Sequence, residues 1–155
     1  MNEFSYINFN SFTTSQICDL IVERIYKSVC DILDNTYCYI GDQLFIRDSN
    51  HTFFNTNFLL LVDEIKHLMR LEAKIVFPYI KEEGKHRPQN QSPNVIIQRQ
   101  KNIIKLLLET RIAFLQLQIG LENSTEKQII ENDLFHLESI IKEWFLIVNQ
   151  KLLNT

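Results

Sequence analysis

Apolar residues recur at steps of three and four along four long stretches of the chain. These stretches cover residues 16–40, 55–83, 94–119 and 126–153. Such steps place side chains on one face of an α-helix, so each stretch predicts an amphipathic helix. The faces expected of the first and fourth helices are Ile21, Ile25, Val29 and Ile32, and Ile130, Leu134, Leu137, Ile141, Trp144 and Val148.

Short polar residues and a glycine mark the expected ends of the first helix. Thr13, Thr14 or Ser15 can cap its start, because their hydroxyl groups accept hydrogen bonds from the first turn. Gly41 is expected to end it, since glycine readily adopts the left-handed conformation that closes a helix. Residues 42–54 are then predicted to form a polar loop.

Proline and glycine also divide the rest of the chain. Pro78 lacks the amide of the i→i−4 hydrogen bond and is expected to interrupt the second helix. Residues 84–93 are rich in turn-forming residues and separate two helical hairpins. Gly120 is expected to end the third helix, and Ser124 or Thr125 can cap the fourth.

Four amphipathic helices with three connections predict an all-α fold, an up-down-up-down four-helix bundle. The 155 residues include only three glycines and three prolines, which disfavours a fold of many short strands. Residues 1–14 show no clear periodicity and are expected to form an extended arm that packs on the bundle. Residues 15–155 are expected to form one domain.

One carboxylate interrupts the apolar pattern of the second helix. The expected apolar face consists of Phe58, Leu61, Ile65, Leu68, Glu72, Ile75 and Tyr79. A buried carboxylate is costly unless it is hydrogen-bonded, paired or bound to a metal. Glu72 is therefore expected either to belong to a site or to bond across the core with Tyr26 or Gln100, in which case burial should raise its pKa.

Composition and charge narrow the classes of function. Basic residues are scattered and the net charge is −3, so no nucleic-acid partner is expected. No run of about 18 apolar residues occurs, so no membrane span is expected. The first twelve residues lack the pattern of a secretory signal. Three cysteines without a metal-binding spacing predict reduced, mostly buried thiols and a cytoplasmic protein.

Three segments resemble a known family. Residues 72–80 read EAKIVFPYI and look like the E-x-x-(I/V)-L-F-P-x-I ending of the second helix in hemerythrin-like proteins. Residues 21–26, IVERIY, resemble I-V-E-x-(Y/H)-H in the RIC-type di-iron proteins implicated in the repair of iron–sulfur clusters. Residues 137–153 resemble the closing L-x-x-H-x-x-x-E-N-x-x-L-F-P, with Asn149 kept and Asn154 in the place of the proline.

The resemblance implies a bundle that holds two irons through histidines and bridging carboxylates, yet most ligand positions differ here. Only Glu72 keeps a ligand of the family, and His67 lies one position away from the expected histidine. An indole cannot ligate iron, so Trp144 is expected to fill the space of the metal pair. The positions that would line this lost site are Tyr26, Leu68, Glu72, Gln100, Trp144 and Val148.

A shifted metal site is the alternative. Glu64 and Asp133 each precede a histidine by three residues, His67 and His136, and paired E-x-x-H motifs bind two metals in ferritin-like bundles. Two such pairs also arise easily by chance in a helical chain. A metal site would then use Glu72, His67, His136 and Glu64.

Three hypotheses follow for the function. The first is a metal-free, non-enzymatic hemerythrin-like bundle without a catalytic residue or cofactor, which acts as a binding or regulatory module in nitrosative or oxidative stress. Its partner would be another protein or a second copy. The second is a divergent non-haem di-iron protein in iron–sulfur cluster repair or in oxygen or nitric oxide sensing. The third is a small-molecule pocket in the place of the irons.

Overall fold

The chain folds into long helices. A computed structural model describes Phe4 and residues 7–43, 49–83, 93–118 and 125–153, and no strand occurs among these residues. The prediction of an all-α fold is confirmed. None of the helices in the described part is long and apolar enough to cross a membrane.

In the described part of the chain, three of the four long helical segments contain one widened π turn each. The elements are α1 (Thr14–Leu20), a π turn (Ile21–Ile25), α2 (Tyr26–Gln43), α3 (Ser49–Leu71), a π turn (Glu72–Val76), α4 (Phe77–Glu83), α5 (Pro93–Gln118), α6 (Thr125–Ile147) and a π turn (Val148–Leu152). A π turn closes i→i+5 hydrogen bonds and adds one residue to a helical turn. The helix continues as α2 and α4 after the first two π turns, whereas the third π turn is the last helical element of the described residues.

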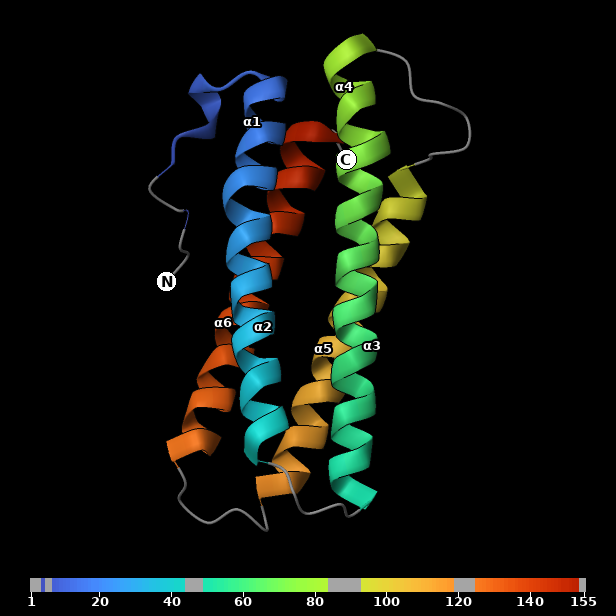
Figure 1. Ribbon diagram of the computed structural model, residues 1–155. Helices are drawn as coiled ribbons and strands as arrows, with labels where there is room; N and C mark the ends of the chain where they lie inside the picture. Colours follow the sequence, from blue (N-terminus) through green and yellow to red (C-terminus); the bar gives the residue numbers. More distant parts are fainter. Residues whose placement is uncertain (1–3, 5–6, 44–48, 84–92, 119–124, 154–155) are drawn as a thin grey trace.

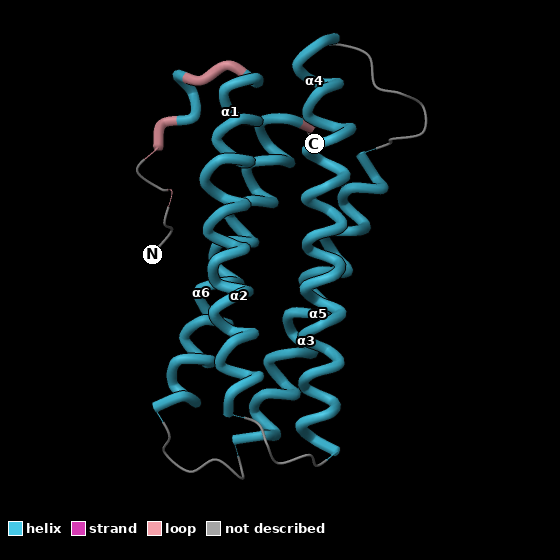
Figure 2. The backbone as a smooth tube through the Cα atoms, in the orientation of Figure 1, coloured by secondary structure: helices cyan, strands magenta, loops and turns pink. Residues whose placement is uncertain are grey.

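The long segments lie along a common axis. In Figure 1 the chain descends through α1 and α2, ascends through α3 and α4, descends through α5 and ascends through α6. Helix α3 packs mainly on α5, and α2 packs mainly on α6. Figure 2 shows these two pairs side by side along most of their length.

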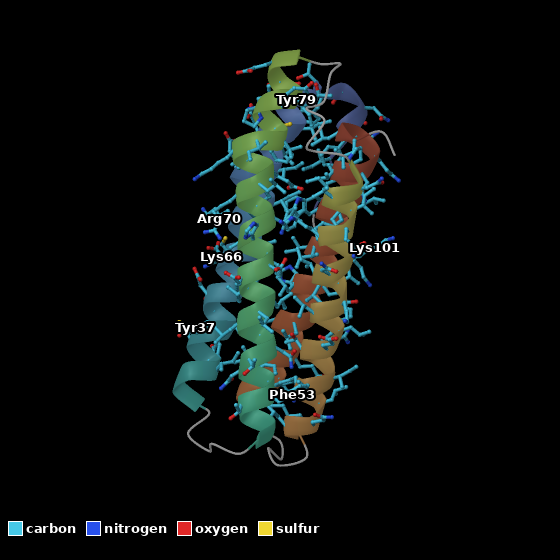
Figure 3. All side chains as sticks on the ribbon, turned by 90° about the vertical axis from the view of Figure 1, so that its right-hand side faces the viewer. Tyr37, Phe53, Lys66, Arg70, Tyr79 and Lys101 are labelled. Carbon is cyan, nitrogen blue, oxygen red and sulfur yellow. The ribbon has the colours of Figure 1, made fainter. Side chains whose placement is uncertain are left out.

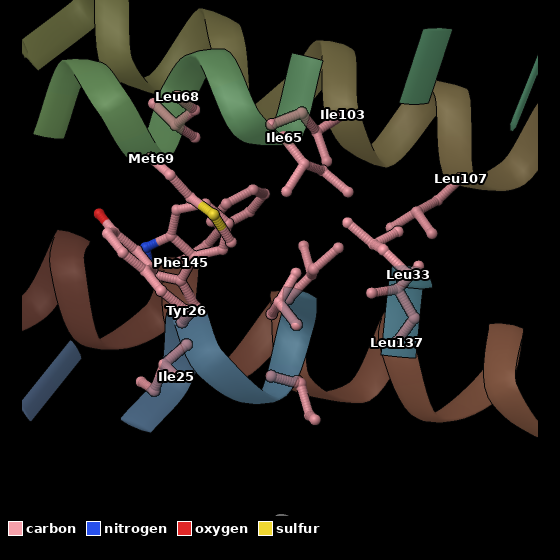
Figure 4. Packing of buried hydrophobic residues seen from close by; sticks show 14 of the residues in the cluster. Ile25, Tyr26, Leu33, Ile65, Leu68, Met69, Ile103, Leu107, Leu137 and Phe145 are labelled. Atoms are coloured by element: carbon pink, nitrogen blue, oxygen red, sulfur yellow. The ribbon is translucent and has the colours of Figure 1, made fainter. Parts of the chain in front are cut away.

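The core lies between the two pairs of helices. Figure 4 shows Ile65 and Ile103 on the α3–α5 side, facing Leu33 and Leu137 on the α2–α6 side. The expected apolar faces of the first and fourth helices are all buried. Trp144 is the largest side chain among those with almost no exposed surface.

The end of the first helix and the start of the second differ from the sequence expectation. Helix α2 runs through Gly41 to Gln43, so the prediction that Gly41 ends the first helix is wrong. Helix α3 already begins at Ser49, so the predicted loop over residues 42–54 is wrong at 42–43 and 49–54, and residues 44–48 lie outside the described residues. One glycine inside a helix costs only about 1 kcal/mol, which packing elsewhere readily offsets. Residues 84–92 and 119–124, with Gly120 and Ser124, lie outside the described residues.

The N-terminal arm contacts the bundle. Thr13 caps α1 in a capping box, in which its hydroxyl group accepts from the Gln16 amide at 3.2 Å and Gln16 Oε1 accepts from the Thr13 amide. A 3₁₀ turn, Phe9–Ser11, precedes it. Phe4 is buried, and its amide donates to Glu143 Oε1 of α6 at 3.1 Å.

Candidate functional site

A π turn sets the direction of Glu72. The turn begins at Glu72, and the Phe77 amide donates to the Glu72 carbonyl group, five residues back. The extra residue moves the buried face along by one position, so Val76 and Phe77 are buried while Ile75 is 44% exposed. The prediction that Ile75 continues the buried face is therefore wrong, and Tyr79 is only half-buried.

The π turn also explains why Pro78 does not end the helix. In an α-helix the proline ring clashes with the carbonyl group four residues back, and the missing amide leaves that carbonyl without its partner. The wider turn before Pro78 gives the proline ring more room next to the preceding carbonyl groups, and α4 continues to Glu83.

Glu72 joins three helical segments through one oxygen atom. Its side chain is fully buried, and its Oε1 accepts a hydrogen bond from the Tyr26 hydroxyl group at 2.6 Å and from Trp144 Nε1 at 2.9 Å. Its Oε2 has no hydrogen-bond partner among the described residues. The predicted bond to Tyr26 is present, and the indole is a second donor that the sequence interpretation treated only as a space-filling group.

Aromatic rings enclose this carboxyl group. The Tyr26 and Trp144 rings meet edge to face with centroids 5.3 Å apart, and Trp144 packs on Phe145 at 4.9 Å. Phe77 stacks on Tyr26 at 6.4 Å. Figure 4 shows Tyr26 and Phe145 in the core together with Met69 of α3. These rings bring both donors to Glu72 and occupy the space next to it.

Burial controls the protonation of the cluster. Loss of water raises the pKa of Glu72 to about 7, although the hydrogen bonds from Tyr26 and Trp144 act to lower it. Burial and the neighbouring Glu72 carboxylate raise the pKa of Tyr26, so its phenol keeps its proton. Burial also raises the pKa of the nearby Cys18 thiol to about 11. Glu72 is thus the group of this cluster that gains or loses a proton near neutral pH.

Gln100 does not reach Glu72. Its side-chain amide forms two reciprocal hydrogen bonds with Asn149, of 3.0 and 2.9 Å, between α5 and the last π turn. The alternative pairing of Glu72 with Gln100 is therefore wrong, and Asn149 is a partner that the sequence interpretation missed. Leu68 and Val148 are fully buried and offer only hydrocarbon surface.

The residues of the shifted metal site do not come together. His67 and His136 are exposed on α3 and α6, and Glu64 lies 3.9 Å from Arg99. Asp133 accepts a hydrogen bond from Thr36. Within the described part of the chain, no three side chains of the ligand types His, Cys, Asp and Glu form a group that could hold a metal.

The three cysteines differ in burial. Cys18 is buried, Cys30 is partly buried and Cys38 is exposed, so the expectation of mostly buried thiols holds only in part. Burial raises the pKa values of Cys18 and Cys30, which favours the unreactive thiol over the thiolate.

The fold and the site together describe an all-α bundle with a buried cluster of Tyr26, Glu72 and Trp144. The chain matches no model of a protein family, no curated protein and no solved structure. The resemblance to hemerythrin-like proteins consequently stays a prediction based on the sequence segments.

Proposed function

We propose that this chain is a metal-free, hemerythrin-like helical bundle that acts as a binding or regulatory module and does not catalyse a reaction. The observation that carries the proposal is the pair of donors on Glu72. In the resembled family this position bridges two irons, whereas here the Tyr26 hydroxyl group and the Trp144 indole use its Oε1 as their acceptor. Protein donors thus take the place of metal ions.

The chemistry of the two donors supports this proposal. An indole N–H donates hydrogen bonds and has no lone pair for a metal. A phenol ligates iron well only as a phenolate, and the raised pKa of Tyr26 opposes that form. Glu72 would be the family ligand that remains, and one carboxylate does not hold two irons.

The burial of the cluster supports a structural role over a catalytic one. Glu72 and Trp144 have no exposed surface and Tyr26 is 8% exposed, so a substrate could reach them only if the helices separated. A binding module instead uses its outer surface and needs the core only for shape. A role in nitrosative or oxidative stress follows from the resemblance alone and is part of the proposal.

Metal analysis tests the proposal directly. The chain is produced in iron-supplemented cells, purified without chelator and measured for iron, manganese and zinc. We expect far less than one metal ion per chain, and two irons per chain would overturn the proposal.

Thermal unfolding gives an independent measurement. A ligand that binds the native state raises the midpoint of thermal unfolding. Since the proposal expects no metal site, added Fe(II), Mn(II) or Zn(II) should leave the midpoint of the purified chain unchanged. A Trp144→His variant, which restores an imidazole at the family position, is the matched comparison. A rise in the midpoint of the unaltered chain would favour the di-iron alternative.

A further inference from the structure

Helix α5 carries apolar residues on two opposite faces. Its inner face is buried in the core through Ile103, Leu107 and Phe114. On the outer face, Leu108, Ile112 and Leu115 are 59%, 48% and 54% exposed. Steps of four and three place these three on one side of the helix. Scattered exposed apolar residues are normal, but an apolar row along one helix face indicates a surface that a partner covers.

A groove lies beside this row. It has a volume of about 410 Å³ between α5 and α6 and is lined by Ile97, Gln100, Lys101, Ile104, Lys142, Phe145 and Asn149. Ile104 lies one turn before Leu108, so the exposed row follows the α5 side of the groove along the same face of the helix. We call the groove and the row Leu108, Ile112 and Leu115 together the α5 surface.

The α5 surface is bordered by positive charge. Lys105 pairs with Glu109, while Arg111 and Lys142 both pair with Glu138. Three cations thus share two carboxylates, and Lys101 adds a fourth cation. In Figure 3, Lys101 lies on the outer side of α5, away from α3. This surface is therefore basic on a chain whose net charge is −3.

The positive charge of the α5 surface favours an acidic partner over a second copy of the chain. A two-fold dimer would place the α5 surface against an identical copy of itself and bring the two sets of cations together. An acidic partner would meet these cations with opposite charges, which favours association and correct orientation.

We propose that the α5 surface binds an amphipathic helix of another protein, with apolar residues at three- and four-residue steps and acidic residues beside them. This mode of recognition lays the apolar face of a helix into a hydrophobic groove. The inference rests on the proposed role as a binding module and names the class of partner.

Fluorescence anisotropy with designed peptides tests the proposal on the full chain. The probe is a labelled helical peptide with leucines at three- and four-residue steps flanked by glutamates. The comparison peptide has lysines in place of the glutamates. We expect the acidic peptide to bind at least tenfold more tightly, and more weakly as salt is added.

Variants locate the binding surface. Replacement of Leu108, Ile112 and Leu115 by serine should weaken binding of the acidic peptide at least tenfold. The control replaces the exposed Phe53, Leu59 and Leu60 of α3 by serine and should leave binding unchanged. Circular dichroism confirms that each variant is folded, which exposed positions should permit.

Three outcomes would overturn the proposal. These are equal binding of acidic and basic peptides, binding unaffected by the α5 substitutions, and a concentration-dependent dimer that the α5 substitutions abolish. Failure here would leave the proposed metal-free bundle standing, since metal analysis tests that separately. Conversely, iron in the purified chain together with intact peptide binding would overturn only the metal-free assignment.

Discussion

The carboxyl group of Glu72 is balanced between its charged and neutral forms. Complete burial favours the neutral form, whereas two donors on Oε1 favour the carboxylate. The other oxygen has no partner among the described residues, so the charged form is only half solvated by the protein. Small changes at the two donors should therefore alter both the pKa and the stability of the fold.

This balance makes the stability of the fold depend on pH. The pKa of Glu72 is about 7 in the folded chain and ordinarily 4.5. Below pH 4.5 both the folded and the unfolded chain carry the proton, and the group imposes no charge penalty. Between pH 4.5 and 7 the unfolded chain loses its proton first, so stability falls as pH rises. Each unit of difference between the two pKa values corresponds to about 1.4 kcal/mol. The free energy of unfolding is therefore about 3 kcal/mol lower above pH 7 than below pH 4.5.

A Glu72→Gln variant isolates this effect. The neutral amide keeps an oxygen acceptor for Tyr26 and Trp144 but cannot become charged. Urea unfolding at several pH values measures the free energy of unfolding of both chains. The value for the variant minus the value for the unaltered chain should increase by about 3 kcal/mol from pH 4.5 to pH 8. A constant difference across this range would contradict the raised pKa. A strong loss of stability at pH 8 would instead fit a metal-binding carboxylate.

The hydrogen bond from Tyr26 is open to a similar measurement. Tyr26→Phe removes a buried 2.6 Å bond to Glu72 and should cost about 1–3 kcal/mol at pH 8, where the carboxyl group is mostly charged. It should also raise the pKa of Glu72 further. Tyr37→Phe, at a position that is 57% exposed, is the control and should have little effect. If the combination of Tyr26→Phe with Glu72→Gln is additive, the two side chains are not coupled.

Sequence reasoning reached Glu72 because a charge in an apolar row is conspicuous, and it reached Tyr26 as a possible partner. It missed the donor role of Trp144, since periodicity shows that a residue faces the core but not which atom it presents there. Gln100 faces the core as expected, yet its partner is Asn149. Which side chains meet across the core depends on how far the helices are shifted along the bundle axis, and a single sequence does not show this shift.

At the scale of elements, the π turns set which residues face inwards. The spacing of apolar residues predicts an ideal α-helical face, but the face shifts by one residue at Glu72–Val76. Pro78 indicated a disturbance of the helix, and the structure shows a widened turn before it instead of an end. The sequence pattern could locate this disturbance but could not give its form.

A deletion tests the role of this π turn. A π turn is one residue longer than an α turn, so removing the exposed Ile75 together with Pro78→Ala should produce a regular α-helix. Val76 and Phe77 would then fall three and four residues after Glu72, still on its buried face. We expect this variant to keep a cooperative thermal transition by circular dichroism.

Deleting the exposed Lys66 from α3 is the matched control. That deletion turns every later residue by about 100° and should expose Leu68 and Glu72. It should abolish cooperative unfolding. If both deletions abolish cooperative unfolding, the π turn at Glu72 does not tolerate the loss of a residue better than the rest of the helix does.

At the scale of the whole molecule, the bundle is built from the pairs α2–α6 and α3–α5. Composition and periodicity predicted the all-α class and four long helices. They could not predict these pairings, because every helix has an apolar face that fits several neighbours. They also predicted an arm over residues 1–14 without showing where it is attached.

Phe4 is the residue through which the arm should stabilise the bundle. It is only 4% exposed, and burying a phenylalanine contributes about 1.5–3 kcal/mol, from which the cost of ordering the arm is subtracted. Phe4→Ala should therefore lower the free energy of unfolding by about 2 kcal/mol in urea. The control is Asn10→Ala, which removes the exposed 3.0 Å bond from Lys151 and should cost less than about 0.5 kcal/mol. Equal effects of the two substitutions would mean that the arm is tethered to the bundle without contributing to its core, and the folded unit would then begin at the Thr13 cap.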